Sequence, residues 1–402
     1  MKPVYLIRSD AIQTTNSRKS RIIVLLTFIL ALGALNPIYG TIGISLFECL
    51  YLGMLSKMKV GIPSSFSFLW LLLFGVTYVI FGQLTLSYVE YYLVATLSAF
   101  LAGHYCSGII NNDVEKSTKA LIYTIVFAEA THALLNTIVN VGTVRWRLVD
   151  FFRGYRSATG SAFINTFVFS LAFVFVFIEQ RRLIRIIGIT CVTISFIYSF
   201  ILGTRTTYIV TAVVLTINVL LFFRERLEFR QYVKVINGLL IFALLAFIIY
   251  HRDLFRVRAM MERSNLFIRF TEIGLIKSDQ FRMESVGKGI QSLLEHPFGG
   301  QIERRYFHNM WLDAGRIGGV FPFVFLIMYS INTLFHVIYL FRKKALDITY
   351  RYTVLSIYTG IMLNCFTEPV LEGIMESFLV FVFINGLVDT DYKKLKRRLS
   401  GN

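Results

Sequence analysis

Residues 199–215, SFILGTRTTYIVTAVVL, decide the fold class of this chain. Two solidly apolar runs meet there, with a single arginine, Arg205, in the short gap between them. Apolar runs of about 17–25 residues are long enough to cross a bilayer as helices, and here such runs recur from end to end. They are solid rather than alternating, and in lipid the backbone must satisfy its own hydrogen bonds, so they predict helices. The sequence therefore predicts an all-α polytopic membrane protein.

The composition of the whole chain supports this prediction. Of its 402 residues, 55% are hydrophobic and only 16% are charged, and the mean hydropathy is +0.63. The net charge of +17 would suggest nucleic acid in a soluble protein. In a membrane protein, positive charge instead gathers in short cytoplasmic connections. We therefore expect membrane lipids as partners and no nucleic acid.

The apolar runs predict about twelve membrane-spanning helices within one transmembrane domain, residues 1–402. The expected spans are 22–36, 38–55, 64–83, 86–109, 120–140, 161–179, 183–202, 206–223, 233–250, 317–341, 352–367 and 371–388. A large loop, 251–316, separates the ninth span from the tenth. Within it, SVGKGIQSLLEH predicts a helix that ends before Pro297.

The charge of the short connections predicts the orientation. Segments such as SRKSR, QRRLIR and FRKK are rich in Lys and Arg, which places them in the cytoplasm. Both termini then lie in the cytoplasm, the basic tail 389–402 included, and the 251–316 loop lies outside. The polar, basic stretch before the first span lacks a cleavage site, so we expect an uncleaved anchor.

Arginines gather on the predicted outer face. They are Arg145, Arg147, Arg153, Arg156, Arg205, Arg282, Arg304, Arg305 and Arg316. The guanidinium group binds phosphate in a bidentate way and stays charged at any working pH, so this pattern indicates an anionic ligand such as a diphosphate. Pairing with lipid headgroups or loop carboxylates is the alternative. Arg205 stands apart, because a charge so close to hydrocarbon costs a few kcal/mol unless it is paired or faces a cavity.

His308 precedes the tenth span in HNMWLDAGRIGG. An imidazole can accept a proton near neutral pH, although spacing alone equally allows an interfacial hydrogen-bonding role. Asn309 is a candidate helix cap. Inside the spans, Glu129 and His132 share a helix face, with His104 as a possible neighbour, and they could be either a buried pair or a site. We expect no metal, because the Asp-Thr-Asp at 389–391 has nothing around it to hold one.

Three segments, in this order, resemble the bacterial O-antigen polymerase and O-antigen ligase superfamily. LGTRTTYIVTAVVL resembles its arginine-bearing helix start, and QFRMESVGKGIQSLLEHPFGG resembles its arginine-containing helix with a proline-glycine turn. HNMWLDAGRIGGVFPFVFL resembles its His-Asn entry to the next span. The resemblance covers roughly residues 200–330.

The resemblance implies a GT-C-like glycosyltransferase without metal or cofactor in the bacterial inner membrane, with its active site facing the periplasm. The donor would be a glycan on undecaprenyl diphosphate. Arg205 and Arg282 would bind the departing diphosphate, and His308 would deprotonate the acceptor hydroxyl. Other residues would bind substrate, namely Asn309, Asp313, Arg145, Arg147, Tyr306, Trp311, Arg304 and Arg305.

A polymerase of lipid-linked repeat units is the function that this pattern favours, with a chain-length regulator protein as a possible partner. An O-antigen ligase, which transfers finished glycan to lipid A-core, would need the same donor chemistry. A flippase or transporter of the same lipids is the third alternative. Transporters generally show repeat-related halves, and no internal repeat is visible in this sequence.

Overall fold

The computed structural model describes residues 5–32, 39–55, 63, 65–82, 89–107, 113–140, 148–152, 154–156, 158–225, 229–253, 275–301 and 306–400. The elements of the first half are α1 (Tyr5–Leu32), α2 (Tyr39–Leu55), α3 (Phe66–Phe81), the π-helix η1 (Glu90–Ala95), α5 (Thr96–Cys106), α6 (Val114–Asn140), β1 (Leu148–Asp150), β2 (Gly154–Arg156), α7 (Ala158–Ser170), the π-helix η2 (Val174–Ile178) and α8 (Arg182–Leu202). Those of the second half are α9 (Arg205–Glu225), α10 (Phe229–His251), α13 (Leu275–Glu295), α14 (Met310–Gly318), α15 (Val320–Arg342), α16 (Ile348–Cys365), α17 (Val370–Gly373) and α18 (Met375–Ser400).

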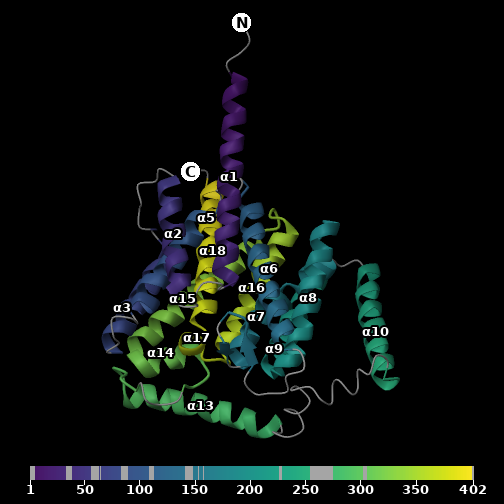
Figure 1. The fold of residues 1–402 in the computed structure, drawn as a ribbon. Helices are drawn as coiled ribbons and strands as arrows, with labels where there is room; N and C mark the ends of the chain where they lie inside the picture. Colours follow the sequence, from purple (N-terminus) through teal and green to yellow (C-terminus); the bar gives the residue numbers. More distant parts are fainter. Residues whose placement is uncertain are drawn as a thin grey trace.

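Most of the long helices form one bundle in which they run up and down, while α10 stands to the side of it (Figure 1). Each predicted span overlaps at least one described helix, and the described secondary structure is helical apart from the antiparallel hairpin of β1 and β2. Among the described residues, four segments are long and apolar enough to cross a membrane, namely Glu115–Asn140, Arg182–Leu202, Arg205–Glu225 and Val320–Arg342. The all-α class and the multi-pass character are thus confirmed, and twelve crossings remain a prediction.

Helices α5 and α18 pack at the centre of the bundle with their backbones in close contact. A Cβ atom on Gly103 would overlap the carbonyl oxygen of Phe383, and one on Gly386 would overlap that of Phe100. Small residues at such positions let two helices approach closely where lipid supplies no hydrophobic drive for association. This pair anchors the apolar core around Phe100, Phe378 and Phe383, which are fully buried.

Contacts between α9 and α16 show which ends of the helices lie together. Arg351, near the start of α16, binds Glu225 at the end of α9 with N–O distances of 2.7 and 3.1 Å. Farther along, Ser356 donates to Asn218 at 3.0 Å. The two helices are therefore antiparallel, and Arg205 at the start of α9 lies level with the chain that follows Cys365.

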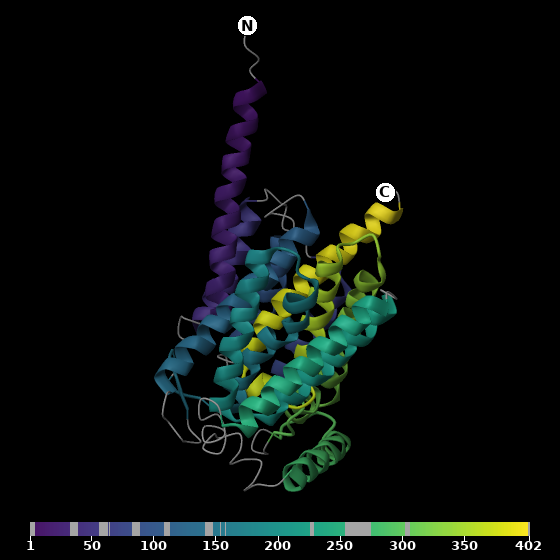
Figure 2. The same cartoon turned by 90° about the vertical axis from the view of Figure 1, so that its right-hand side faces the viewer.

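Helices α13 and α14 lie at that same end of the bundle, with α13 running across it (Figures 1 and 2). The predicted helix over SVGKGIQSLLEH is confirmed within α13, which ends at Glu295, two residues before Pro297. α13 packs on α14, because a Cβ on Gly289 would lie only 3.0 Å from Leu312. The predicted 251–316 loop is thus partly helical.

Two glycine pairs join the end of α13 to the connection between α14 and α15. Gly299 and Gly319 have φ angles of 76° and 81°, which side chains with a Cβ rarely adopt. The N–H of Gly300 donates to the carbonyl of Ile317 and that of Val320 to the carbonyl of Pro297, both at 2.8 Å. A Cβ on Gly299 or Gly319 would overlap the opposite backbone. The HPFGG and RIGG stretches therefore form one backbone-to-backbone joint.

Helix α18 continues to Ser400, so most of the basic tail, 389–402, extends the last helix. Asp389 and Asp391 are buried within the bundle. Asp391 accepts hydrogen bonds from Ser107 at 2.6 Å and from Tyr350 at 2.8 Å. The Asp-Thr-Asp stretch is therefore surrounded by hydrogen-bonding side chains of other helices. Both carboxylates tie α18 to neighbouring helices.

Candidate functional site

His308 lies at the end of the bundle where α13 and α14 are found, just before α14 begins. Its φ angle is 56°, in the left-handed region that few non-glycine residues occupy. Its Nδ1 lies 3.7 Å from Oε2 of Glu368, a side chain only 4% exposed. Tyr306 meets the imidazole edge-on, with ring centres 4.9 Å apart. Strained residues of this kind are concentrated at functional sites, so the backbone is consistent with a site at His308.

Asn309 and Asp313 hold the backbone on both sides of His308. The Asn309 side chain accepts from the N–H of Leu312 at 3.1 Å, which confirms it as the N-cap of α14. Asp313 accepts from the N–H of Phe307 at 2.6 Å. Burial raises the pKa of Asp313 to about 7, although this hydrogen bond acts in the opposite direction. Asp313 is fully buried, so the geometry favours an orienting role over direct contact with a sugar.

Arg316 is buried one helical turn beyond Asp313 and forms an ion pair with Glu372. Its Nη2 binds the carboxylate of Glu372, and its Nη1 donates to the carbonyl of Gln301 at 2.7 Å. Nε also lies 4.0 Å from Asp313. Arg316 therefore connects α14, α17 and the turn after α13, and these contacts stabilise the backbone around the site.

An apolar cavity of about 550 Å³ adjoins α14, between α15 and α16. Its lining includes Asn309, Trp311, Ser330, Ile331, Met362 and Phe366. Trp311 donates its indole N–H to Ser330 at 3.1 Å, and its ring centre lies 4.4 Å from that of Phe366. Trp311 is thus part of the cavity wall and is 5% exposed. Asn309, the residue after His308, also lines this cavity, so a polar site adjoins an apolar one.

Arg205 is the first residue of α9, and the local sequence explains the tight turn before it. Gly203 ends α8 with a φ of 65°, the left-handed geometry common after a helix. Thr204 then shares a hydrogen bond of 3.1 Å with Thr207 in the first turn of α9. Arg205 is half-buried and lies at the same end of the bundle as His308.

The other predicted site residues are described in part or not at all. The backbone of Arg282 lies in the middle of α13, two turns before Gly289, where α13 packs on α14. The side chain of Arg282 lies outside the described structure. Arg145, Arg147, Arg304 and Arg305 also lie outside the described residues. Tyr306 is exposed beside His308.

The histidines inside the spans have partners that the sequence did not indicate. Nε2 of His132 lies 2.9 Å from Asp150 in the hairpin, and Asn136 donates to the same carboxylate at 3.2 Å. His104 lies 3.5 Å from Asp389 near the other end of the bundle. The expectation that His104 neighbours Glu129 and His132 is therefore wrong, because α5 directs it toward α18. In the described part of the chain, no three His, Cys, Asp or Glu side chains form a group able to hold a metal ion.

Sequence reasoning missed Glu368 and Glu372. Both lie in TEPVLEG, with Glu368 between the last two predicted spans and Glu372 at the start of the last one, and the fold places them against His308 and Arg316. Two acids so close together where one apolar run ends and the next begins are a signal that could have drawn attention to them.

Comparison of this sequence with models of known protein families and with curated proteins finds no match.

Proposed function

We propose that this chain is a membrane glycosyltransferase of the O-antigen polymerase and ligase superfamily, and specifically a polymerase of lipid-linked oligosaccharide repeat units. It transfers the growing glycan from undecaprenyl diphosphate to a hydroxyl of a new undecaprenyl-diphosphate-linked repeat unit. The proposal rests on the ordered sequence segments between residues 200 and 330, and on the chemistry of the residues around His308.

One observation carries the proposal furthest. A histidine held beside a buried carboxylate, His308 with Glu368 at 3.7 Å, adjoins an apolar cavity of about 550 Å³. A lipid-linked sugar has the same two parts, because its headgroup needs polar partners and its tail needs an apolar surface. A general base located where the polar and the apolar surface meet would lie next to the reacting hydroxyl of such a substrate.

The reaction assigns one role to each side chain. The acceptor hydroxyl attacks the anomeric carbon of the donor sugar, and His308 takes the hydroxyl proton as the new C–O bond forms. The bond between that carbon and the diphosphate oxygen breaks, and undecaprenyl diphosphate leaves with both bonding electrons. Arg205 and Arg282 stabilise the charge that develops on the diphosphate, as fixed cations do at other leaving groups. Glu368 orients the imidazole and stabilises its protonated form.

The proposal includes an orientation. Both termini lie in the cytoplasm of a bacterial cell, and the end of the bundle that carries His308 faces the periplasm, as the basic short connections favour. Lipid-linked repeat units then reach the apolar cavity from the outer half of the inner membrane. A chain-length regulator would act on this face.

The test is incubation of the purified full chain with undecaprenyl-diphosphate-linked repeat units, followed by sizing of the products. We expect elongated glycan from the wild type. Arg205→Ala, Arg282→Ala and His308→Ala should each lower the rate by at least about 100-fold, the scale of a general-base or oxyanion contribution. His251→Ala and Arg252→Ala are matched controls, because both residues are exposed at the end of α10. Wild-type product ladders from all three site variants would contradict the proposed site.

The same purified protein and lipid-linked substrates distinguish the two alternative functions, ligase and flippase. A ligase would join preformed glycan to lipid A-core and would not elongate lipid-linked repeats. A flippase would elongate nothing and would move the labelled lipid across a vesicle membrane.

A further inference from the structure

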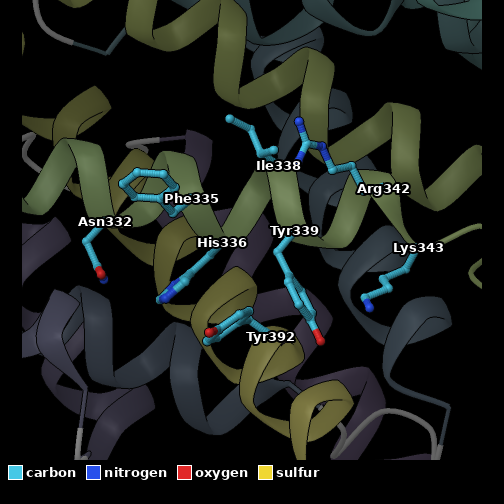
Figure 3. Close-up of a pocket in the computed structure, with 8 residues that line it drawn as sticks. All are labelled: Asn332, Phe335, His336, Ile338, Tyr339, Arg342, Lys343 and Tyr392. Atoms are coloured by element: carbon cyan, nitrogen blue, oxygen red, sulfur yellow. The ribbon is translucent and has the colours of Figure 1, made fainter. Parts of the chain in front are cut away.

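A second cavity, of about 410 Å³, lies between α15 and α18. Six of its lining residues, Asn332, His336, Tyr339, Arg342, Lys343 and Tyr392, define what we call the basic pocket (Figure 3). The pocket lies toward the end of α15 opposite to α14, which at 1.5 Å per residue is about 30 Å from the His308 site. No step of the proposed transfer reaction uses it.

Aromatic rings form one wall of the basic pocket. His336 and Tyr339 extend from α15 toward Tyr392 of α18 (Figure 3). The rings of His336 and Tyr392 stack with centres 4.1 Å apart, and Tyr339 meets Tyr392 edge-on at 4.9 Å. Such a wall is rigid, and its phenol hydroxyls can donate hydrogen bonds to a polar ligand.

Cations surround this wall. The Lys343 Nζ lies 4.6 Å from the centre of the Tyr339 ring, and the Lys396 Nζ lies 5.9 Å from that of Tyr392. Arg342 lines the cavity one residue before Lys343. Within the described part of the chain, Arg342, Lys343 and Lys396 form no ion pair with a carboxylate.

The buried carboxylate behind the pocket does not offset these charges, because it already has partners. Asp389 accepts from Ser65 at 2.6 Å and pairs with Lys393 at 3.1 Å. His104 and His336 lie 3.5 and 3.6 Å from its oxygens. Asp389 therefore lies beside His336 behind the aromatic wall, and three cations remain to attract an anion.

An apolar flank indicates that the anion belongs to a lipid. Phe335, which also lines this cavity, is 65% exposed on α15. An acyl chain can lie along this surface while its headgroup meets Arg342 and Lys343. Basic pockets between membrane helices are typical sites for phosphate-bearing headgroups.

We propose that the basic pocket binds the phosphate-bearing headgroup of an anionic phospholipid from the leaflet at this end of the bundle. The phosphate lies between Lys343 and Arg342, and the aromatic wall donates hydrogen bonds to the headgroup. This lipid joins α15 to α18 and is separate from the glycan-carrying lipid at the other end.

The test measures lipid binding to the purified full chain by native mass spectrometry, with phosphatidylglycerol and phosphatidylcholine compared at equal concentration. We expect phosphatidylglycerol adducts to dominate. The double variant Arg342→Gln/Lys343→Gln should weaken their binding at least about tenfold, or about 1.4 kcal/mol. Lys344→Gln is the control. It removes one positive charge from the next, exposed residue, which does not line the cavity, and it should bind as the wild type does.

Three results would overturn the proposal. One is unchanged phosphatidylglycerol binding by the double variant. Another is an equal loss in Lys344→Gln, which would indicate diffuse surface charge. The third is displacement of the lipid by millimolar inorganic phosphate, which would indicate a soluble phosphate ligand. Because the readout is binding, failure here leaves the glycan-transfer assay unaffected, and failure of that assay leaves this test intact.

Discussion

His308 and Glu368 come from two different connections of the bundle, and they meet with Nδ1 3.7 Å from Oε2. His308 precedes α14 with a left-handed backbone, and Glu368 follows α16 with its own carboxylate buried. A carboxylate beside one ring nitrogen fixes the orientation of an imidazole and leaves the other nitrogen to face a substrate. The predictions below test this pair and the structure that supports it.

Glu368 is a positioning residue in the proposed transfer. Glu368→Gln keeps the shape of the side chain but loses its charge, so we expect a fall in kcat of about 10- to 100-fold with little change in KM. Loss of an interaction made only in the transition state has this signature. Glu368→Asp should recover part of the rate. Equal losses in Gln and Asp variants, together with a lower thermal midpoint, would instead indicate a structural role.

The apolar cavity holds the lipid tail in our proposal. Ile331→Trp adds volume at a lining position, so KM for undecaprenyl-linked substrate should rise about fivefold or more. A short-chain diphosphate analogue should not be affected, because it does not fill the cavity. Ile241→Trp, on exposed α10 at the edge of the bundle, is the control. A rise in KM for both substrates would mean that the cavity does not bind the tail.

The glycine joint between α13 and α15 should determine stability. Gly299→Ala and Gly319→Ala place a Cβ against the opposite backbone at a positive φ. Each should lower the free energy of unfolding by about 1–3 kcal/mol or more. Gly287→Ala, where a Cβ meets nothing within 4 Å in α13, should instead stabilise by up to about 1 kcal/mol. The thermal midpoints of the detergent-purified variants will test this order of stabilities. Equal midpoints in all three variants would contradict the proposed role of the joint in stability.

Asp313 gives a defined pH dependence. Its pKa is about 7 in the folded protein, against 3.8 for the free side chain. The folded state therefore holds a proton that the unfolded state has lost, and stability falls as pH rises from about 4 to about 7. Asp313→Asn keeps an oxygen that accepts the hydrogen bond from the N–H of Phe307. The amide does not titrate, so the variant should lose this pH-dependent part of the free energy of unfolding. We expect the midpoint difference, variant minus wild type, to grow between pH 5 and pH 7.5. A constant difference would contradict the assignment.

Patterns along the chain predicted the helices well, together with the local structure around one candidate site residue. The helix before Pro297 and the cap at Asn309 could be predicted because they depend on neighbours within a few residues. The proximity of Glu368 to His308, of Glu372 to Arg316 and of Asp150 to His132 could not. Each depends on how separate helices pack, and apolar runs of similar composition do not specify which of their faces meet.

The sequence by itself determined the class of this protein, because a backbone in lipid has to bond to itself and long apolar runs then leave few alternatives to helices. It also determined particular helix ends, such as the N-cap of α14 at Asn309 and the left-handed Gly203 after α8. Tertiary structure alone decided which charges became partners. An ion pair in a bundle depends on helix order, rotation and depth, which arise from side-chain packing across the whole molecule.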